Sequence, residues 1–238
     1  MSRVDASRDE TALKRDIALA CRILAAGGQG DSVYGHVTGR FAGWERMWMK
    51  PAEIGLDECR PEELILVDFD GKVLAGSRPR HDEFAIHSEI MRARPDVLSI
   101  VHTHPKFSIA FAARGLRLRP VSHEGSYFWP PDVPLFEEFT DLVRTREQGQ
   151  RVARALGDRP ALFLRNHGIA VCGADVAAAT CAALMLERAC EIQLLAQPAD
   201  DTRFAHTTEE EAVAKRRIWR EHGARVAFEH YARQLGAH

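Results

Sequence analysis

Short runs of apolar or alternating residues, separated by turn residues, constrain this fold more than any other feature of the sequence. Runs of this length and pattern are typical of β-strands. They occupy residues 36–41, 46–49, 64–67, 97–101, 161–164 and 169–172. The segment Asp68-Phe-Asp-Gly71 is typical of a hairpin turn and leads into a further run at 72–75. The pattern therefore predicts a sheet with antiparallel neighbours.

Helices are predicted where apolar residues recur with the helical period. The predicted helices span residues 10–26, 82–92, 175–197 and about 208–234. Glycines end the first of them, and Pro95 closes the second. No repeat, low-complexity tract or linker divides the chain. We therefore expect one α/β domain over residues 1–238, with a mixed or antiparallel sheet and a C-terminal helix at about 208–234.

The charge and composition exclude several classes of partner. The formal net charge is −2, and no basic or acidic block accompanies it, so neither a nucleic acid nor a membrane partner is indicated. The five cysteines contain no C-x-x-C pair, which argues against a disulfide framework and a cysteine-ligated zinc. Neither an apolar leader nor an apolar run of the roughly 18 residues needed to span a membrane is present. We expect a cytoplasmic protein that binds a small molecule.

Three histidines at strand ends form a candidate metal site. His102-Thr-His104 follows the run 97–101, and because side chains alternate along a strand, both imidazoles lie on one face. An H-x-H pair alone is also compatible with a polar loop edge. His167 ends another apolar strand, where Gly168 permits a tight reversal. Three neutral imidazoles with one open position are the arrangement expected of a catalytic divalent ion.

Glu83 is the candidate acid/base beside these histidines. It begins the helix whose following strand leads to His102, so a short connection can return the chain to the same rim of the sheet. The alternative for Glu83, and for Asp82, is a first-turn carboxylate favoured by the helix dipole. His87, one turn along the same helix face, is expected to be a buried, hydrogen-bonded histidine rather than a ligand.

These residues resemble the class II aldolase/adducin family. The resemblance covers roughly residues 10–200 and consists of Glu83, His102-Thr-His104 nineteen residues later, and His167-Gly168. It implies an αβα sandwich around a largely antiparallel sheet, assembled as a homotetramer with active sites at subunit interfaces. It also implies a zinc or manganese ion on the three histidines, and such donor sets accept iron as well. In sugar-phosphate members the ion stabilises an enediolate while the glutamate moves a proton.

The sequence departs from the family where sugar-phosphate members bind phosphate. His36, Ala52-Glu53 and His81-Asp82 stand where those members carry small donor groups. The carboxylates would repel a phosphate, which disfavours a phosphosugar aldolase. The proton-donor tyrosine of some aldolases has no clear counterpart, with Tyr127 and Phe136 as the nearest candidates.

A basic and aromatic rim is predicted in place of the phosphate cradle. It comprises Lys50, Arg78, Arg80, His36 and His81, bordered by Trp48, Phe128 and Trp129 if they face inward. Such a rim suits a planar, carboxylated substrate. The run before Glu83 and the Gly-His-Val turn resemble the family branch that decarboxylates hydroxyaromatic acids such as dihydroxyphthalate or a hydroxypyridine dicarboxylate. Glu83 and His81 are the expected catalytic residues, and His36, Arg80 and Lys50 the expected substrate-binding residues.

Three alternatives stay open at this point. The first is a class II aldolase acting on an unphosphorylated hydroxy-carbonyl compound. The second is an iron-dependent oxygenase, since the fold hosts one and three histidines bind iron(II). The third is a non-catalytic scaffold of the adducin kind, which the presence of Glu83 and all three histidines disfavours.

Overall fold

A mostly antiparallel sheet forms the centre of the molecule. The computed structural model describes residues 3–197, 204–219 and 223–236. Within these residues the strand order is β4-β3-β2-β1-β5-β8-β7-β6, and only β6 and β7 pair in parallel. The strands are β1 (His36–Gly39), β2 (Arg46–Met49), β3 (Ile65–Asp68), β4 (Val73–Ala75), β5 (Ser99–Thr103), β6 (Leu135–Phe136), β7 (Ala161–Leu164) and β8 (Gly168–Gly173). The predicted largely antiparallel sheet is confirmed.

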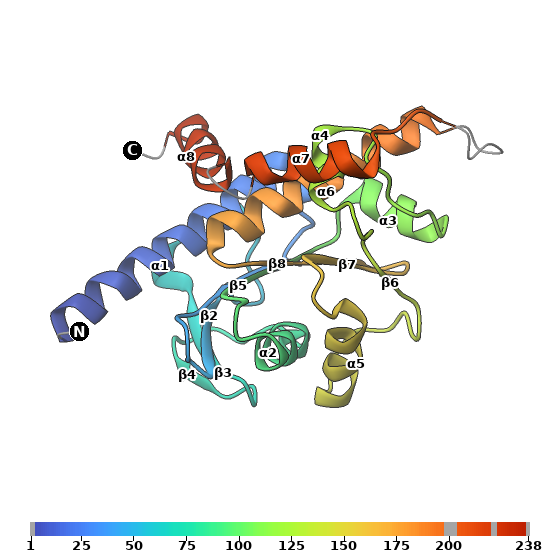
Figure 1. Cartoon of the computed structure of the whole chain (residues 1–238). Helices are drawn as coiled ribbons and strands as arrows, with labels where there is room; N and C mark the ends of the chain where they lie inside the picture. Colours follow the sequence, from blue (N-terminus) through green and yellow to red (C-terminus); the bar gives the residue numbers. More distant parts are fainter. Residues whose placement is uncertain (1–2, 198–203, 220–222, 237–238) are drawn as a thin grey trace.

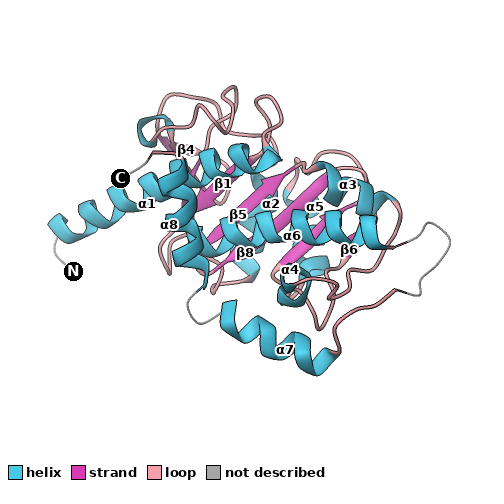
Figure 2. Cartoon of the chain, turned by 90° about the horizontal axis from the view of Figure 1, so that it is seen from above, coloured by secondary structure: helices cyan, strands magenta, loops and turns pink. Residues whose placement is uncertain are grey.

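Helices cover both faces of this sheet (Figure 1, Figure 2). The long helices α1 and α6 lie with α3 on one face, and α2 and α5 lie on the other. The helices are α1 (Arg3–Leu24), α2 (Phe84–Ala93), α3 (Lys106–Ala113), α4 (His123–Tyr127), α5 (Arg146–Leu156), α6 (Val176–Ala196), α7 (Glu209–Ile218) and α8 (Ala224–Gln234). The αβα sandwich that the family resemblance implied is confirmed. None of the helices in the described ranges is long and apolar enough to cross a bilayer.

The two-sided covering explains why the central strands are apolar throughout. In β7, Ala161 and Phe163 pack into the core beneath α1 and α6, whereas Leu162 and Leu164 pack into the core beneath α2 and α5. Successive side chains of a strand point to opposite faces, so a strand buried on both faces carries no polar alternation.

The same alternation decides where the histidines of β5 lie. Val101 packs on the α1 and α6 side, and Ile100 packs on the α2 and α5 side. His102 therefore shares the face of Ile100, the face on which α2 begins, while Thr103 points the other way. His104 follows the end of the strand and returns to the side of His102.

Several predicted boundaries are corrected by the structure. The strand expected at 97–101 is β5, which is shifted toward the C-terminus and includes His102. The helix expected at 208–234 is two helices, α7 and α8, and residues 220–222 between them lie outside the described residues. The predicted helices and strands did not include α3, α4, α5 and β6. A signal for α5 was present, because Thr145 and Gln148 form a capping box at its start.

A glycine sets the close packing of α5 on α2, the helix that begins next to Glu83. A Cβ on Gly149 would lie 2.5 Å from the main-chain oxygen of Ala85. No side chain can be accommodated there without moving one helix away from the other, and overpacking of this kind typically costs about 1–3 kcal/mol.

We expect Gly149→Ala to lower the free energy of unfolding by about 2 kcal/mol, although alanine is the better helix former. The measurement is urea unfolding of both proteins. Gly30→Ala is the matched control, because Gly30 has a φ of −72° and its nearest neighbours would lie at 3.6 Å. That variant should be as stable as the parent or slightly more stable. Equal stability of the Gly149 variant and the parent would contradict the proposed packing.

Candidate metal centre

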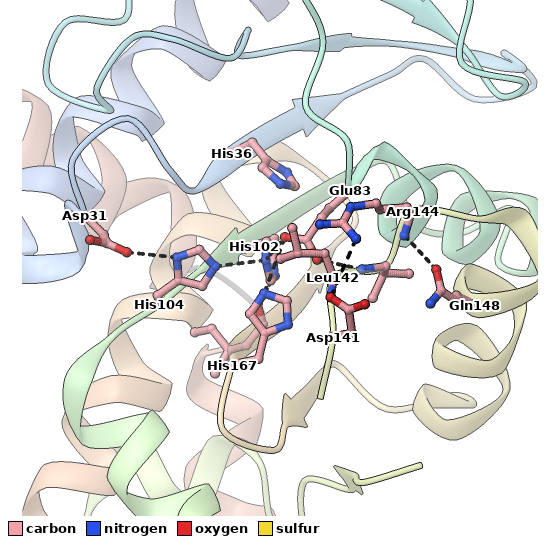
Figure 3. Close-up of polar contacts among 12 residues, drawn as sticks. Asp31, His36, Glu83, His102, His104, Asp141, Leu142, Arg144, Gln148 and His167 are labelled. Atoms are coloured by element: carbon pink, nitrogen blue, oxygen red, sulfur yellow. Dashed lines mark hydrogen bonds and ion pairs between the residues drawn. The ribbon is translucent and has the colours of Figure 1, made fainter. Parts of the chain in front are cut away.

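His102 is oriented by the strand beside it. It is fully buried, and its Nδ1–H donates to the main-chain oxygen of Ile169 in β8 over 2.9 Å. The antiparallel register of β5 and β8 places His102 opposite Ala170, so that Ile169 is one residue further along the neighbouring strand. Because a neutral imidazole carries one hydrogen, Nε2 is left with a lone pair that points toward Glu83 (Figure 3).

His104 is oriented by a carboxylate from the loop after α1. Its Nδ1 lies 3.1 Å from Asp31 Oδ2, so Nδ1–H donates to that oxygen and Nε2 again carries the lone pair. The Nε2 atoms of His102 and His104 are only 3.2 Å apart. Two lone pairs facing each other at this distance are unfavourable unless a proton or a cation lies between them.

His167 enters the same space from the turn between β7 and β8. Asn166 adopts a φ of +56°, so the left-handed residue of this turn is Asn166 and not the glycine that the sequence analysis had assigned to the reversal. Gly168 is required for another reason: a Cβ there would collide with the main-chain oxygen of Thr103. Among the described residues, His167 Nε2 is a buried nitrogen without a hydrogen-bond partner.

Glu83 contributes the one oxygen donor of the group. It occupies the N-cap position of α2, and its Oε2 lies 3.4 Å from the Nε2 atoms of both His102 and His167. Oε1 accepts a hydrogen bond from the main-chain N–H of Val143 over 2.9 Å. Burial raises the pKa of this carboxyl, whereas positive charge at its contacts with His102 and His167, from protonated rings or from a cation between them, lowers the pKa well below its usual range.

These four side chains fit a divalent cation. One ligand atom from each of Glu83, His102, His104 and His167 lies within 4.8 Å of the other three. Ligands about 2.1 Å from a tetrahedral ion would be about 3.4 Å apart, which matches the closest donor separations. A cation would also provide a partner for His167 Nε2 and separate the facing lone pairs of His102 and His104. Three nitrogens and one oxygen suit zinc, manganese and iron(II), so the donor set does not select one metal.

Gln29 supports this group from the opposite face of β5. The chain leaves α1 through a π-helical turn at Ala25–Gln29, and Gln29 is buried there. Its Oε1 accepts from the hydroxyl of Thr103 over 2.6 Å, and its amide donates to Ala183 of α6. The residue between the two histidines is thereby tied to two helices. Sequence reasoning missed Gln29, Asp31 and Val143, because their roles depend on contacts between distant segments.

A cavity of about 690 Å³ opens beside the four donors. Its lining includes His81 and Arg80, as predicted, together with Asp82, Glu53, Asn166 and Tyr34, which is 58% exposed. Arg80 is already engaged: its guanidinium donates to the main-chain oxygens of Gly71 and His81 and stacks on Phe84.

His81 lines the cavity, and His36 and Lys50 lie next to His81. The His36 ring lies 4.3 Å from that of His81 and 4.9 Å from that of His102, centroid to centroid. Burial and the nearby Lys50 lower the pKa of His81 to about 3, so its ring is neutral near pH 7. Lys50 is fully buried rather than exposed to the cavity, and its ammonium donates to Val33 O over 2.7 Å and lies 3.3 Å from His81 Nε2.

Several residues of the expected rim lie elsewhere. Arg78 pairs with Glu63 beside a different cavity. Trp48, Phe128 and Trp129 do not line the cavity beside the four donors, and Trp48 instead donates its indole N–H to Glu10. Tyr127 and Phe136 are also absent from its lining, and Phe136 belongs to the core beneath α2 and α5. Side chains with apolar surface that do line it include Tyr34, Ile109 and Leu142.

Asp31→Ala is expected to lower metal affinity by about 10- to 100-fold, because Asp31 holds His104 in the orientation that directs Nε2 at the ion. Competition with a chromophoric chelator measures the affinity. Asp31→Asn is the matched variant, since its amide oxygen can still accept from Nδ1–H, and it should lose less affinity than the alanine variant. Unchanged affinity in Asp31→Ala would show that Asp31 does not position the ligand.

Lys50 makes a defined contribution to pH-dependent stability. Burial lowers its pKa from 10.5 to about 8, so between these pH values the unfolded chain binds a proton that the folded chain has released. Its contribution to unfolding free energy therefore rises with pH over this interval, by up to about 3 kcal/mol. Urea unfolding at pH 8 and pH 10.5 should show this rise in the difference between the parent and Lys50→Met. A difference that is constant with pH would contradict the lowered pKa.

Comparisons with known proteins agree with this geometry. The family described as Class II Aldolase and Adducin N-terminal domain matches residues 15–194. A 3,4-dihydroxyphthalate decarboxylase from Arthrobacter keyseri is 33% identical over 183 residues, which are 72% of this chain and 73% of that protein. A 4-hydroxy-3-prenylphenylpyruvate oxygenase/4-hydroxy-3-prenylbenzoate synthase from Streptomyces roseochromogenus subsp. oscitans is 34% identical over 154 residues, 64% of this chain and 55% of that protein.

A solved structure shows the same fold. The L-fuculose 1-phosphate aldolase from Glaciozyma antarctica PI12 has a TM-score of 0.84 and 27% identity with this chain, and the match covers 99% of this chain and 94% of that one. Sequence and fold therefore agree over most of the chain, and the protein belongs to the class II aldolase and adducin family.

Proposed function

We propose that this protein is a metal-dependent carbon–carbon lyase that decarboxylates a hydroxylated aromatic or heteroaromatic carboxylic acid. The observation that carries the proposal is the convergence of Glu83, His102, His104 and His167 beside a cavity that lacks a phosphate cradle. The similarity to a dihydroxyphthalate decarboxylase supports the same substrate class.

The charge around the cavity disfavours a phosphorylated substrate. Glu53, Asp82 and Asp31 all border it, and a phosphate dianion held there would face three carboxylates. Arg80 is the one arginine in its described lining, and two of its nitrogens already donate to main-chain oxygens. A hydroxyaromatic acid does not need a positively charged rim of this kind, because its neighbouring hydroxyl and carboxylate oxygens could bind the cation instead.

The size and surface of the cavity suit an aromatic ring. About 690 Å³ lies within the usual range for small-molecule sites, and Val33, Ile109 and Leu142 offer apolar surface to a planar ligand. Tyr34 and Leu142 are partly exposed at this cavity, which supports the expectation that a second subunit covers it. We accordingly keep the homotetramer with shared sites as part of the proposal.

The proposed reaction needs one group that stabilises negative charge on the substrate and one group that transfers a proton. A bound divalent cation would act as a Lewis acid for the hydroxyl and carboxylate oxygens of the substrate. His81 Nε2 lies 3.0 Å from Pro51 O, and when Nε2–H donates to that oxygen, Nδ1 can accept the hydroxyl proton of the substrate. Because the pKa of His81 is only about 3, this transfer requires that a bound cation first makes the hydroxyl more acidic. The carbon–carbon bond electrons then stay on the ring carbon as carbon dioxide leaves, and the proton returns from His81 to that carbon.

Glu83 has two separate tasks in this proposal. Its Oε1 is held by the main-chain N–H of Val143, which fixes the carboxylate so that Oε2 faces the histidines. The negative charge of Oε2 balances the cation, and the same oxygen can exchange a proton with bound substrate. The Glu83→Gln and His102→Ala variants described below distinguish cation binding by Glu83 from proton transfer by Glu83.

Two other reactions have specific support. The similarity to a prenylphenylpyruvate oxygenase favours iron(II) chemistry with molecular oxygen on the same donor set. The similarity in fold to a fuculose phosphate aldolase favours aldol cleavage, here of an unphosphorylated compound. A non-catalytic scaffold is disfavoured, because all four donor side chains are present and converge.

One set of assays separates these reactions. The full chain is loaded with zinc, manganese or iron(II) and incubated anaerobically with dihydroxyphthalates and hydroxypyridine dicarboxylates, and released carbon dioxide is measured. Release without oxygen supports the decarboxylase. Oxygen consumption with iron(II) supports the oxygenase, and carbonyl products from hydroxy-carbonyl compounds support the aldolase. Absence of carbon dioxide with every acid and metal would refute the decarboxylase.

We expect Glu83→Gln to lower kcat by at least about 100-fold with a small change in KM if Glu83 transfers the proton. Metal content should then be close to that of the parent, whereas a cation ligand would lose metal and activity together, as expected for His102→Ala. Glu138→Gln, which alters a surface carboxylate, is the control and should match the parent. Parent-like kcat in Glu83→Gln would remove Glu83 from the mechanism.

A further inference from the structure

A chain of hydrogen bonds leads from the interior of the sheet to the candidate metal centre. Thr38 Oγ1 lies 2.7 Å from His87 Nδ1, and His87 Nε2 lies 2.7 Å from His36 Nδ1. All three residues are buried, with at most 2% of their surface exposed. Both distances are short for hydrogen bonds that involve imidazole nitrogens, so the contacts are well formed.

The architecture explains why these three side chains meet. Thr38 and His36 are two residues apart in β1 and therefore point to the same face of the sheet. His87 lies on α2, one turn beyond Glu83, and α2 packs on that face. His36 stands directly opposite His102 in the register of β1 and β5. His36, the last residue of this series of hydrogen bonds, thus lies beside the candidate metal ligands, as Figure 3 shows.

The positions of the hydrogen atoms in this series of hydrogen bonds can be assigned one after another, beginning at Thr38. In the described part of the protein, His87 Nδ1 is the hydrogen-bond partner of the Thr38 hydroxyl. If Nδ1 carried a hydrogen and donated it, the hydroxyl hydrogen would have no acceptor in a buried position, which is strongly unfavourable. The hydroxyl therefore donates to Nδ1, and His87 carries its hydrogen on Nε2.

This order determines which nitrogen of His36 carries hydrogen. His87 Nε2–H donates to His36 Nδ1, so Nδ1 must be the acceptor and the hydrogen of His36 must be on Nε2. The result is the same if His87 carries a second hydrogen, because Nε2 of His87 donates in either case. Since Nδ1 is engaged by His87, Nε2–H is the group that His36 can offer to a ligand.

We propose that Thr38 and His87 are positioning residues that make His36 a hydrogen-bond donor, through Nε2–H, to an oxygen of a bound hydroxyaromatic carboxylate. The tautomer of His36 follows from the hydrogen-bond chain alone, and the nature of the ligand rests on the proposed function. His36 then holds a substrate oxygen in place and does not accept its proton. That leaves proton transfer to His81 and Glu83.

The test compares Thr38→Val with Thr38→Ser. Valine has nearly the same shape as threonine but leaves His87 Nδ1 without a donor, whereas serine keeps the hydroxyl. His87→Gln is the second variant, because its amide can still donate to His36 Nδ1. Thermal unfolding and metal content show whether each variant keeps the fold and the site.

Two measurements on the full chain read out the proposal. Nitrogen-15 NMR of histidine-labelled, zinc-loaded protein, with the His36 signals assigned through His36→Gln, reports which nitrogen carries hydrogen. We expect Nε2–H in the parent, in Thr38→Ser and in His87→Gln, and a mixture of tautomers in Thr38→Val. Salicylate serves as a non-reacting probe of ligand affinity. Its Kd should rise by about tenfold in Thr38→Val and by less than twofold in Thr38→Ser.

The outcomes separate this proposal from the proposed function. A hydrogen on His36 Nδ1 in the parent overturns the proposal even if the protein is an active decarboxylase. Equal salicylate affinity in the valine and serine variants, with metal content unchanged, also overturns it. If the tautomer and the affinities behave as expected and no acid is decarboxylated, the positioning proposal stands and the proposed reaction fails.

Discussion

The antiparallel pairing of β5 with β8 is the interaction on which the rest of the site depends. It brings the main-chain oxygen of Ile169 to the Nδ1–H of His102, and it holds the turn before β8, which carries His167, next to the end of β5. The pairing of β5 with β1 places His36 on the other side of His102. Three histidines that are distant in the sequence therefore meet because their strands are neighbours in one sheet.

The close approach of these histidines is electrostatically unfavourable in the described protein without a cation. The Nε2 atoms of His102 and His104 face each other 3.2 Å apart, and His167 Nε2 is buried without a hydrogen-bond partner in the described structure. Each ring is fixed in this orientation by a contact at its other nitrogen or by a constrained turn. A cation relieves all of these conflicts at once, which is why the group is better explained as a metal site than as a buried polar cluster.

The charge pattern around this group connects the site with its proposed chemistry. Neutral imidazoles and one carboxylate leave a bound divalent ion with net positive charge, and the carboxylates of Asp31, Glu53 and Asp82 surround the cavity. Binding of a substrate oxygen to the ion is thereby favoured over binding of a phosphate to the rim. The buried pair of His36 and His87 adds a directional donor without adding charge, since burial holds the pKa of both rings well below the ordinary value.

The sequence by itself determined most of the strands, most of the long helices and the four candidate donors, because these depend on local periodicity and on residue types at strand ends. It also determined that His87 is a buried, hydrogen-bonded histidine. Only the tertiary structure decided that Lys50 is buried behind His81, that Arg80 is engaged by Gly71, and that Gln29, Asp31 and Val143 hold the site. Local patterns record which side chains can do chemistry, whereas the direction of a side chain and its partner depend on how distant segments pack.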